Sequence, residues 1–370
     1  MLPFPANREA ILLEPLDVLF CRGGRPYAAG HAASAELPTP QVIAGAIRTG
    51  LLAAEGLLPA AGARLDDATF ARLMTVRIRG PLLWRNGEPL VPVPADLVWN
   101  LKRGQGRREL SEGDTPRDGC QQGVRLRPMR QQPEFIKKEN CPHWRPLWKQ
   151  EPEGRRDFEP MNGRWLPASA LVGYLRGEGV PVTALVDAKD LYDHEPLTHV
   201  GIDPESSTAQ DGILFTQTVV RLRRGVCLYV EADRAGWKPL PSSIAVGGDR
   251  HRCRVEVVKP DPRLHAVATK GHTTLLHLTP AIHADPHWCA PEWRSRLISA
   301  AVGSSQPISG WDWRESKPKP TRYAVPAGSV YFLNGDLSME AQGAQAGQLD
   351  DLAAQRAARN GEGLESPNAP

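Results

Sequence analysis

The order of hydrophobic and polar positions near the start of the chain predicts a strand followed by a helix. The run from Glu9 to Phe20 predicts a strand that is broken or bent near Pro15. A polar, glycine-rich loop follows, and Thr39-Pro40 then predicts a helix start, with threonine as N-cap and proline in the first turn. Apolar residues at helical spacing continue beyond it, and residues 66–75 predict a short second helix.

Two strand-like runs, residues 76–85 and 88–99, are separated by Asn86-Gly87. An Asn-Gly pair between apolar runs is the strongest short-range signal for a hairpin. The order strand, helix, hairpin is compatible with half of a ferredoxin-like fold, the architecture of RNA-recognition domains.

Periodic patterns return after an irregular basic stretch. Residues 167–176 predict a helix, and Pro291–Val302 predicts another. The runs 212–222 and 225–232 predict a hairpin that turns at Arg223-Arg224. Further strands are expected at 253–258, 273–278 and 330–333, which together indicate a second α+β domain.

We therefore expect an α+β chain with two domains, an insertion between them and a tail. The expected divisions are a ferredoxin-like domain at 1–100, a basic insertion at 101–165, a second domain at 166–342 and a tail at 343–370. Residues 350–359 suit a helix, and the last ten residues have the composition of disordered segments.

Composition places the chain among globular proteins, and its 370 residues suffice for two domains. No run approaches the roughly 18 apolar residues of a membrane span. The N-terminus lacks the build of a secretory signal, so a cytoplasmic protein is expected. The six cysteines contain no CxxC pair, which favours reduced thiols over a disulfide framework.

The net charge of +3 is too small to indicate a polyanion partner, but its distribution is informative. From Asn100 to Trp165 there are 15 Lys/Arg against 10 Asp/Glu, an excess of +5 that leaves about −2 for the rest of the chain. The same stretch carries Trp144, Trp148 and Trp165. Basic residues among aromatics suit a nucleic acid, and a solvated insertion anchored by tryptophans is an equally good interpretation.

The loop from Cys21 to Pro40 has the residue types that could hold a sugar-phosphate chain. Its glycines allow positive φ and a close backbone approach, and Arg22 and Arg25 offer several donors to phosphate. The next helix begins with free N–H groups, a natural anion site. Glycine and arginine alone would equally well make a plain surface loop, which is the favoured interpretation on those residues only.

Several catalytic classes lack their motifs. The Walker pattern GxxxxGK[ST] is absent, and Gly104-Gln105-Gly106 lacks the third glycine of the dinucleotide fingerprint. No GxSxG elbow marks a nucleophile. The spacing of His283, His287 and Cys289 could suit zinc, but Pro286 disfavours the helix that would align them. We therefore expect no metal, no cofactor and no catalytic residues, although His31 or His199 could act as an acid or base.

The run PLDVLFCRGGRPYAAGHAASAELPTPQVIAGAIRTGLL resembles the N-terminal signature of the third subunit of the Cmr complex, a member of the RAMP superfamily of CRISPR proteins. Three later segments also resemble that family: residues 199–215, AVGGDR at 245–250 and KPTRYAVPAGSVYF at 319–332. Two features depart from it. Cys21 and Gly23 flank Arg22 where the family often has Phe-Arg-Asp, and Gly361-Glu362-Gly363 stands where a Gly-aromatic-Gly loop is common.

The resemblance implies two packed ferredoxin-like (RRM-like) RAMP domains in a type III-B antiviral ribonucleoprotein. It implies a non-catalytic, RNA-binding subunit that recognises the 5′ tag of CRISPR RNA. Its partners would be that RNA, the large polymerase/cyclase-like subunit and the backbone RAMP subunit, with no membrane. The RNA-binding candidates are Arg22, Gly24, Arg25, Tyr27, Gly30, His31, Ser34, Gly45, Arg48, Pro326, Gly328 and Ser329.

Two other functions stay open at this point. Some members of the superfamily cut their precursor RNA, so a metal-independent endoribonuclease is the main alternative. A metal-dependent hydrolase unrelated to CRISPR is a more distant one. The segment Gly201-Ile202-Asp203 is expected to shape the second domain or a subunit interface.

Overall fold

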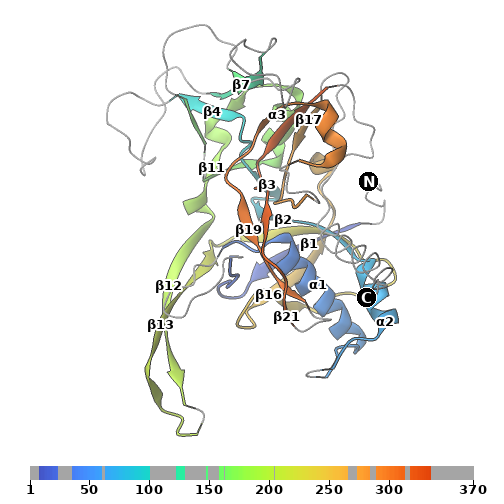
Figure 1. Cartoon of the computed structure of the whole chain (residues 1–370), viewed down its shortest axis with the longest axis vertical. Coiled ribbons are helices and arrows are strands. Elements are labelled where there is room, and N and C mark those ends of the chain that lie inside the picture. The colour runs from blue at the N-terminus through green and yellow to red at the C-terminus, as the bar shows by residue number, and fades with distance from the viewer. Residues whose placement is uncertain are drawn as a thin grey trace, which may run out of the picture.

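A computed structural model of the chain describes residues 8–23, 36–60, 63–100, 122–129, 147–148, 158–161, 163–203, 205–265, 273–283, 289–312 and 317–334. Its centre is an eight-stranded sheet with the order β11-β9-β3-β2-β14-β1-β16-β15 (Figure 1). In chain order these strands are β1 (Glu9–Pro15), β2 (Arg77–Arg85), β3 (Glu88–Pro92), β9 (Arg164–Pro167), β11 (Val186–Asp187), β14 (Val226–Asp233), β15 (Ser243–Ala245) and β16 (Arg252–Val258).

Strand β1, helix α1 (Pro40–Glu55) and strand β2 form a split βαβ unit. Both β1 and β2 pair antiparallel with β14, so they run parallel to each other with β14 between them. The helix begins as expected, with Thr39 as N-cap and proline in its first turn, and ends at Gly56 with φ +73°. Helix α2 (Asp67–Met74) is capped by the Asp66 carboxylate, which accepts from Thr69 N at 2.8 Å.

The Asn86-Gly87 prediction is confirmed, because these residues join β2 to β3 with φ of 54° and 82°. The end of β2 also meets the start of β14, where Arg85 pairs with Val226. Residues 86–225 are thus inserted between two neighbouring strand ends of the central sheet. This segment therefore begins and ends at paired residues, and it contributes β3, β9 and β11 to the same sheet.

The central sheet is covered on both faces, as the alternation of side chains along β1 requires. Ile11 and Leu13 join the core under α1, whereas Ala10 and Leu12 join a second core under α3 (Ala168–Arg176). This arrangement explains the nearly continuous apolar run of β1, because a strand buried on both faces has no polar side.

Smaller sheets surround the central one. A four-stranded sheet has the order β10-β5-β4-β8, and a three-stranded sheet has the order β17-β23-β18. Their strands are β4 (Leu97–Asn100), β5 (Gln122–Arg125), β8 (Phe158–Pro160), β10 (Val180–Pro181), β17 (Thr273–Leu276), β18 (Leu297–Ala301) and β23 (Val330–Leu333). The remaining strands are β6 (Arg127–Pro128), β7 (Leu147–Trp148), β19 (Gln306–Ile308), β20 (Trp311–Asp312), β21 (Lys317–Pro318) and β22 (Arg322–Ala324). Short 3-10 helices lie at Val182–Ala184, Ala188–Asp190, Pro262–His265 and Pro291–Arg296.

A long hairpin of β12 (Tyr192–Ile202) and β13 (Ala209–Leu222) projects from the body (Figure 1). The prediction of a hairpin turning at Arg223-Arg224 was wrong. Strand β13 pairs with β12, while β14 pairs with β1 and β2, so the short turn links two different sheets. Consecutive strands usually pair with each other, but here both edges of β14 pair with strands that are more distant in the sequence.

The helix predicted over Pro291–Val302 was also wrong. Only Pro291–Arg296 is helical, as a 3-10 helix, and Leu297–Ala301 is the strand β18, paired with β23. Strands β14, β15 and β16, expected in the second domain, lie in the same sheet as β1 and β2. Most of the basic stretch and the tail from 335 onward fall outside the described residues.

The described part of the chain is a mixed α/β protein with mostly antiparallel sheets and three α-helices. A pair of ferredoxin-like domains is not confirmed by these elements. Among the described helices, none is long and apolar enough to cross a membrane.

Candidate nucleic-acid interface

The segment Leu19–Gly23 begins the glycine-rich loop, and its base is fixed to the fold. Leu19 exchanges two backbone hydrogen bonds with Val220 of β13, at 2.8 and 2.9 Å. Farther along, Glu36 N donates to Cys21 O at 2.9 Å, which joins the two described ends of the loop. The loop therefore leaves and re-enters the fold at one point, next to the start of α1.

Arg22 is the first exposed residue after a buried run. Val18 to Cys21 are all buried, whereas the Arg22 guanidinium lies over the Phe20 ring, 5.9 Å from its centroid. A guanidinium that stacks on an aromatic face can still donate hydrogen bonds in its own plane. The other candidates in the loop lie outside the described residues, namely Gly24, Arg25, Tyr27, Gly30, His31 and Ser34.

A second loop, residues 246–251, packs on this segment. Gly248 N donates to Phe20 O at 2.7 Å. Gly247 has φ +78°, and a Cβ added there would lie 2.5 Å from Phe20 O, so only glycine fits this position. The loop is thus in direct backbone contact with the residues that precede Arg22.

The same loop holds two neighbouring non-glycine residues in the left-handed region. Asp249 and Arg250 have φ of 54° and 57°, a conformation that costs about 1–2 kcal/mol per residue. The loop is held by a hydrogen bond from Val246 N to His251 O at 2.9 Å and by Gln217 Nε2, which donates to Asp249 Oδ2 at 2.8 Å. Gln217 is buried in β13 opposite Leu197, so the loop is anchored on both sides.

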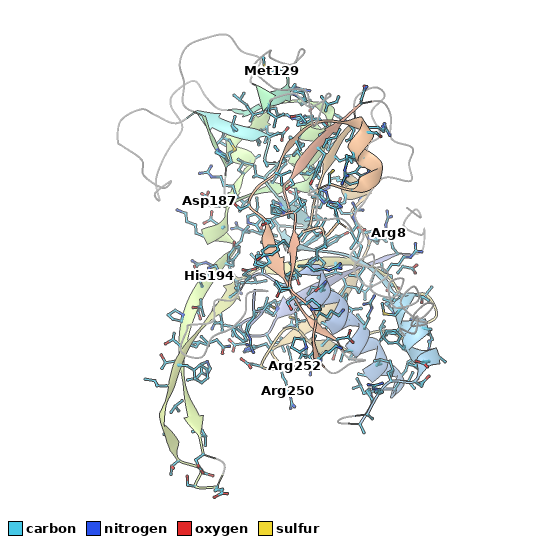
Figure 2. The ribbon with its side chains drawn as sticks, viewed as in Figure 1. Arg8, Met129, Asp187, His194, Arg250 and Arg252 are labelled. Atoms are coloured by element: carbon cyan, nitrogen blue, oxygen red, sulfur yellow. The ribbon has the colours of Figure 1, made fainter. Side chains whose placement is uncertain are left out.

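Arg250 is exposed and points away from the body beside Arg252 (Figure 2). Other arginines of this region are paired: Arg221 with Glu195 and Asp17, and Arg254 with Glu14. Arg250 makes no hydrogen bond or ion pair with any residue that the structure describes. The sequence signal for this exposed arginine is a Gly-Gly pair before two charged residues. The resemblance to the family includes this motif but indicates no binding role for it.

The candidates on α1 differ in exposure. Gly45 is exposed in the middle of the helix, and a Cβ added there would meet nothing within 4 Å. Arg48 is half-buried, and its Nη2 donates to Val76 O at 3.4 Å within the chain. At the N-terminus of the helix, Thr39 Oγ1 is buried without a hydrogen-bond partner among the described residues.

The candidates of the 326–329 turn make contacts within the chain. Ser329 is buried, and its hydroxyl donates to Pro326 O at 2.8 Å. Gly328 has φ +86°, and a Cβ there would lie 2.7 Å from Val93 O. Gly328 O accepts from Ala95 N at 2.8 Å, so this turn joins the three-stranded sheet to the segment after β3.

Burial and stacking limit the chemistry of several described histidines and cysteines. Burial, together with the neighbouring His283, lowers the pKa of His277 to about 3, so His277 is neutral at neutral pH. Burial raises the pKa of Cys21 to about 12, which makes its thiol a poor nucleophile. His199 stacks on Phe215 in the projecting hairpin, with ring centroids 5.3 Å apart.

The histidine and cysteine candidates for zinc are only partly visible. His283 and Cys289 are described, whereas His287 lies outside the described residues. Among the residues that the structure does describe, no group of three histidine, cysteine or acidic side chains is placed to hold a metal ion.

A family model described as CRISPR-associated protein (Cas_Cmr3) matches residues 11–363, nearly the whole chain. The chain belongs to this family. It is the family of the Cmr3 subunit of type III-B complexes, so the resemblance drawn from the sequence is confirmed.

Solved CRISPR complexes contain chains similar to this Cas_Cmr3 protein. One lies in a cryo-EM structure of the Type III-B Cmr-beta bound to cognate target RNA, with 15% identity over 87% of this chain and 86% of that chain, and a TM-score of 0.49. Another, with AMPPnP also bound (state 1), has 14% identity over 95% and 92%, and a TM-score of 0.49. A chain in a Csm3-Csm4 subcomplex of the type III-A CRISPR-Cas interference complex has 11% identity over 89% and 95%, and a TM-score of 0.41. No curated protein matches the sequence.

Proposed function

We propose that this Cas_Cmr3 protein is a non-catalytic, RNA-binding subunit that recognises the 5′ tag of CRISPR RNA. In the type III-B effector complex it would bridge the large polymerase/cyclase-like subunit to the backbone RAMP subunit. The observation that carries the proposal is the fixed base of the loop after Cys21. There an exposed Arg22 stands beside the anchored loop that presents Arg250.

Recognition of a short single-stranded tag requires donors for phosphate and backbone groups that read splayed bases. Arg22 and Arg25 supply the phosphate donors in the proposal, and Arg250 extends them. Tyr27, His31 and Ser34 would contact bases or sugars, and the glycines at 24, 30 and 45 would let the RNA backbone come close. Arg48 and the 326–329 turn act mainly through the chain contacts that hold this surface in place.

The projecting hairpin suits the bridging role. Four of its large apolar side chains are exposed: Val200, Ile202, Leu214 and Phe215. A set of exposed apolar residues on one element is typical of a surface that a partner covers. We propose that this hairpin contacts the neighbouring backbone subunit, with the Ile202 segment in that interface.

Salt-dependent RNA binding tests the tag-binding assignment. We expect Arg22→Ala/Arg25→Ala to weaken binding of tagged RNA and to remove its preference over RNA with a scrambled tag. Each lost phosphate contact lowers the slope of log affinity against log salt by about 0.7 for single strands. The matched control is Arg254→Ala, an exposed arginine paired with Glu14, which should leave binding unchanged. A double variant that assembled and held tagged RNA like the parent would refute the assignment.

A nuclease is the second candidate, since a histidine could act as acid or base. Incubation of the full chain with labelled precursor RNA, without metal, separates the two functions. We expect no discrete cleavage. Cleavage that disappears on changing one histidine, such as His31 or His199, would overturn the non-catalytic proposal.

A further inference from the structure

A β-ribbon near the C-terminal end of the described chain exposes two large aromatic side chains. It consists of two paired strand segments, β19 with β22 and β20 with β21, and we call residues 306–312 and 317–324 the aromatic ribbon. Trp311 is 56% exposed and Tyr323 is 72% exposed. Tyr323 shares with Leu214 the highest exposure among the large apolar residues that the structure describes.

The inner side of the aromatic ribbon is fixed to the start of α1. Gln306 Nε2 donates to Glu36 Oε2 at 2.9 Å, and Ile308 and Ala324 are buried. A Cβ added to Gly310 would lie 3.2 Å from Gln41 Oε1, so the ribbon passes close to the first turn of the helix. Figure 1 shows β19 and β21 crossing in front of α1. The ribbon therefore begins where the glycine-rich loop ends.

Hydrogen bonds hold the middle of the ribbon in a defined shape. Lys319 N donates to Gly310 O at 2.8 Å, and Ser309 Oγ donates to Lys319 O at 2.8 Å. The two exposed aromatic residues are therefore carried by ordered backbone on each strand pair. Side chains with few rotatable bonds on a fixed backbone lose little entropy when a ligand stacks on them.

The charges of the ribbon favour a nucleic acid over a protein as the ligand. Its described residues include three basic residues, Lys317, Lys319 and Arg322, and one acidic residue, Asp312. The net charge of the described ribbon is therefore +2, three minus one. Protein interfaces are poor in lysine, whereas proteins that bind single strands combine exposed aromatic residues with a positive surface.

We propose that the aromatic ribbon is a stacking platform for unpaired bases of single-stranded RNA that continues past the N-terminus of α1. Trp311 and Tyr323 stack on bases, and Arg322 contacts the backbone phosphates. Because every base has a π-face, this contact does not depend on sequence. The proposal rests on the proposed function only in taking RNA as the ligand. It adds a second site, distinct from the tag-reading loop.

Binding of an untagged RNA to the full-length chain tests the platform. The probe is a fluorescent oligouridine, followed by anisotropy. We expect Trp311→Ala and Tyr323→Ala each to weaken binding about 5- to 150-fold, the range of a lost base stack. Trp311→Phe and Tyr323→Phe keep a ring and should stay close to the parent. Val257→Ala, at another exposed apolar position, should have no effect.

An abasic strand of the same length tests whether stacking is the cause. The parent chain should bind it more weakly than oligouridine, whereas Trp311→Ala/Tyr323→Ala should bind both equally. Parent affinities that do not distinguish the two strands would overturn the proposal, as would an oligouridine that the parent does not bind. A double variant with unchanged RNA binding but weaker assembly with other subunits would make the ribbon a protein surface instead.

Variants of the two sites should have different effects on RNA binding. Arg22→Ala/Arg25→Ala should lose the preference for tagged RNA but retain much of its oligouridine binding. Trp311→Ala/Tyr323→Ala should lose affinity for both RNAs and keep the preference. If only the first result is found, the tag-binding function stands and the platform is refuted; if only the second is found, the reverse holds.

Discussion

Replacing Gly45 with alanine separates the needs of the fold from those of a ligand. Gly45 lies in the middle of α1, is exposed, and has open space where its Cβ would be. Glycine inside a helix costs about 0.5–1 kcal/mol relative to alanine, because it loses more backbone entropy on folding. We expect Gly45→Ala to raise the free energy of unfolding by about that amount.

Gly50, in the same helix, is the matched control. A Cβ there would lie 2.8 Å from Ile244 Cγ2 and 3.0 Å from Leu240 Cδ2. Ile244 is buried, so it has little room to move, and overpacking of this kind typically costs about 1–3 kcal/mol. The cost exceeds the gain in helix propensity, and we expect Gly50→Ala to lower the free energy of unfolding.

Denaturant titration of both variants measures these two opposite changes in the free energy of unfolding. Titration of Gly45→Ala with tagged RNA measures its RNA affinity. If the RNA backbone comes close to this helix face, Gly45→Ala binds tagged RNA more weakly although it is more stable. Equal shifts in stability for the two variants would refute the geometric reasoning. A stabilised Gly45→Ala with unchanged RNA affinity would remove Gly45 from the interface.

Three further changes probe the fold. Folding lowers the pKa of His277 to about 3, so between pH 6.5 and 3 the unfolded chain binds a proton at this residue more readily than the folded one. The contribution of His277 to the free energy of unfolding is therefore fully present above its unfolded pKa of about 6.5, and it is lost as pH falls from there toward 3. His277→Gln should therefore flatten the unfolding free energy against pH in that window, by up to about 1.4 kcal/mol per pH unit. Asp96→Ala leaves the half-buried Arg125 without its carboxylate, 3.1 Å away, and should cost about 3–5 kcal/mol by denaturant titration. Gly328→Ala should lower the melting temperature, since it adds about 1–2 kcal/mol of left-handed strain to a clash with Val93 O.

Local signals in the sequence predicted the elements that local interactions determine. The Asn86-Gly87 turn and the Thr39-Pro40 helix start occur as expected, because each depends on residues within a few positions. The cap that Asp66 gives to the second helix, which the sequence analysis did not name, is equally local. The wrong predictions concern segments whose secondary structure depends on pairing with strands far away in the sequence. Leu297–Ala301 has helical spacing, but its backbone hydrogen bonds go to β23, and tertiary context overrides the local preference.

The residues of the candidate interface fall into the same two groups, those that a local motif predicts and those that depend on the tertiary fold. Motif similarity located Arg22, which the structure shows exposed on the Phe20 ring. It did not predict that Gly248 would bond to Phe20, because residues more than 200 positions apart leave no periodic trace of their contact. Nor did it find Trp311 and Tyr323, since exposure depends on which face of a ribbon the fold leaves uncovered.

Strand β14 has consequences for the order in which the chain is synthesised and folds. It lies between β1 and β2, which are made long before it, and it pairs with both along their length. Until residues 226–233 leave the ribosome, the inner edges of β1 and β2 have no partner, although their apolar residues are already made. Such edges invite pairing with other chains. A fragment that stops before Val226 should therefore aggregate rather than fold, and rapid engagement by chaperones or partner subunits would benefit the nascent protein.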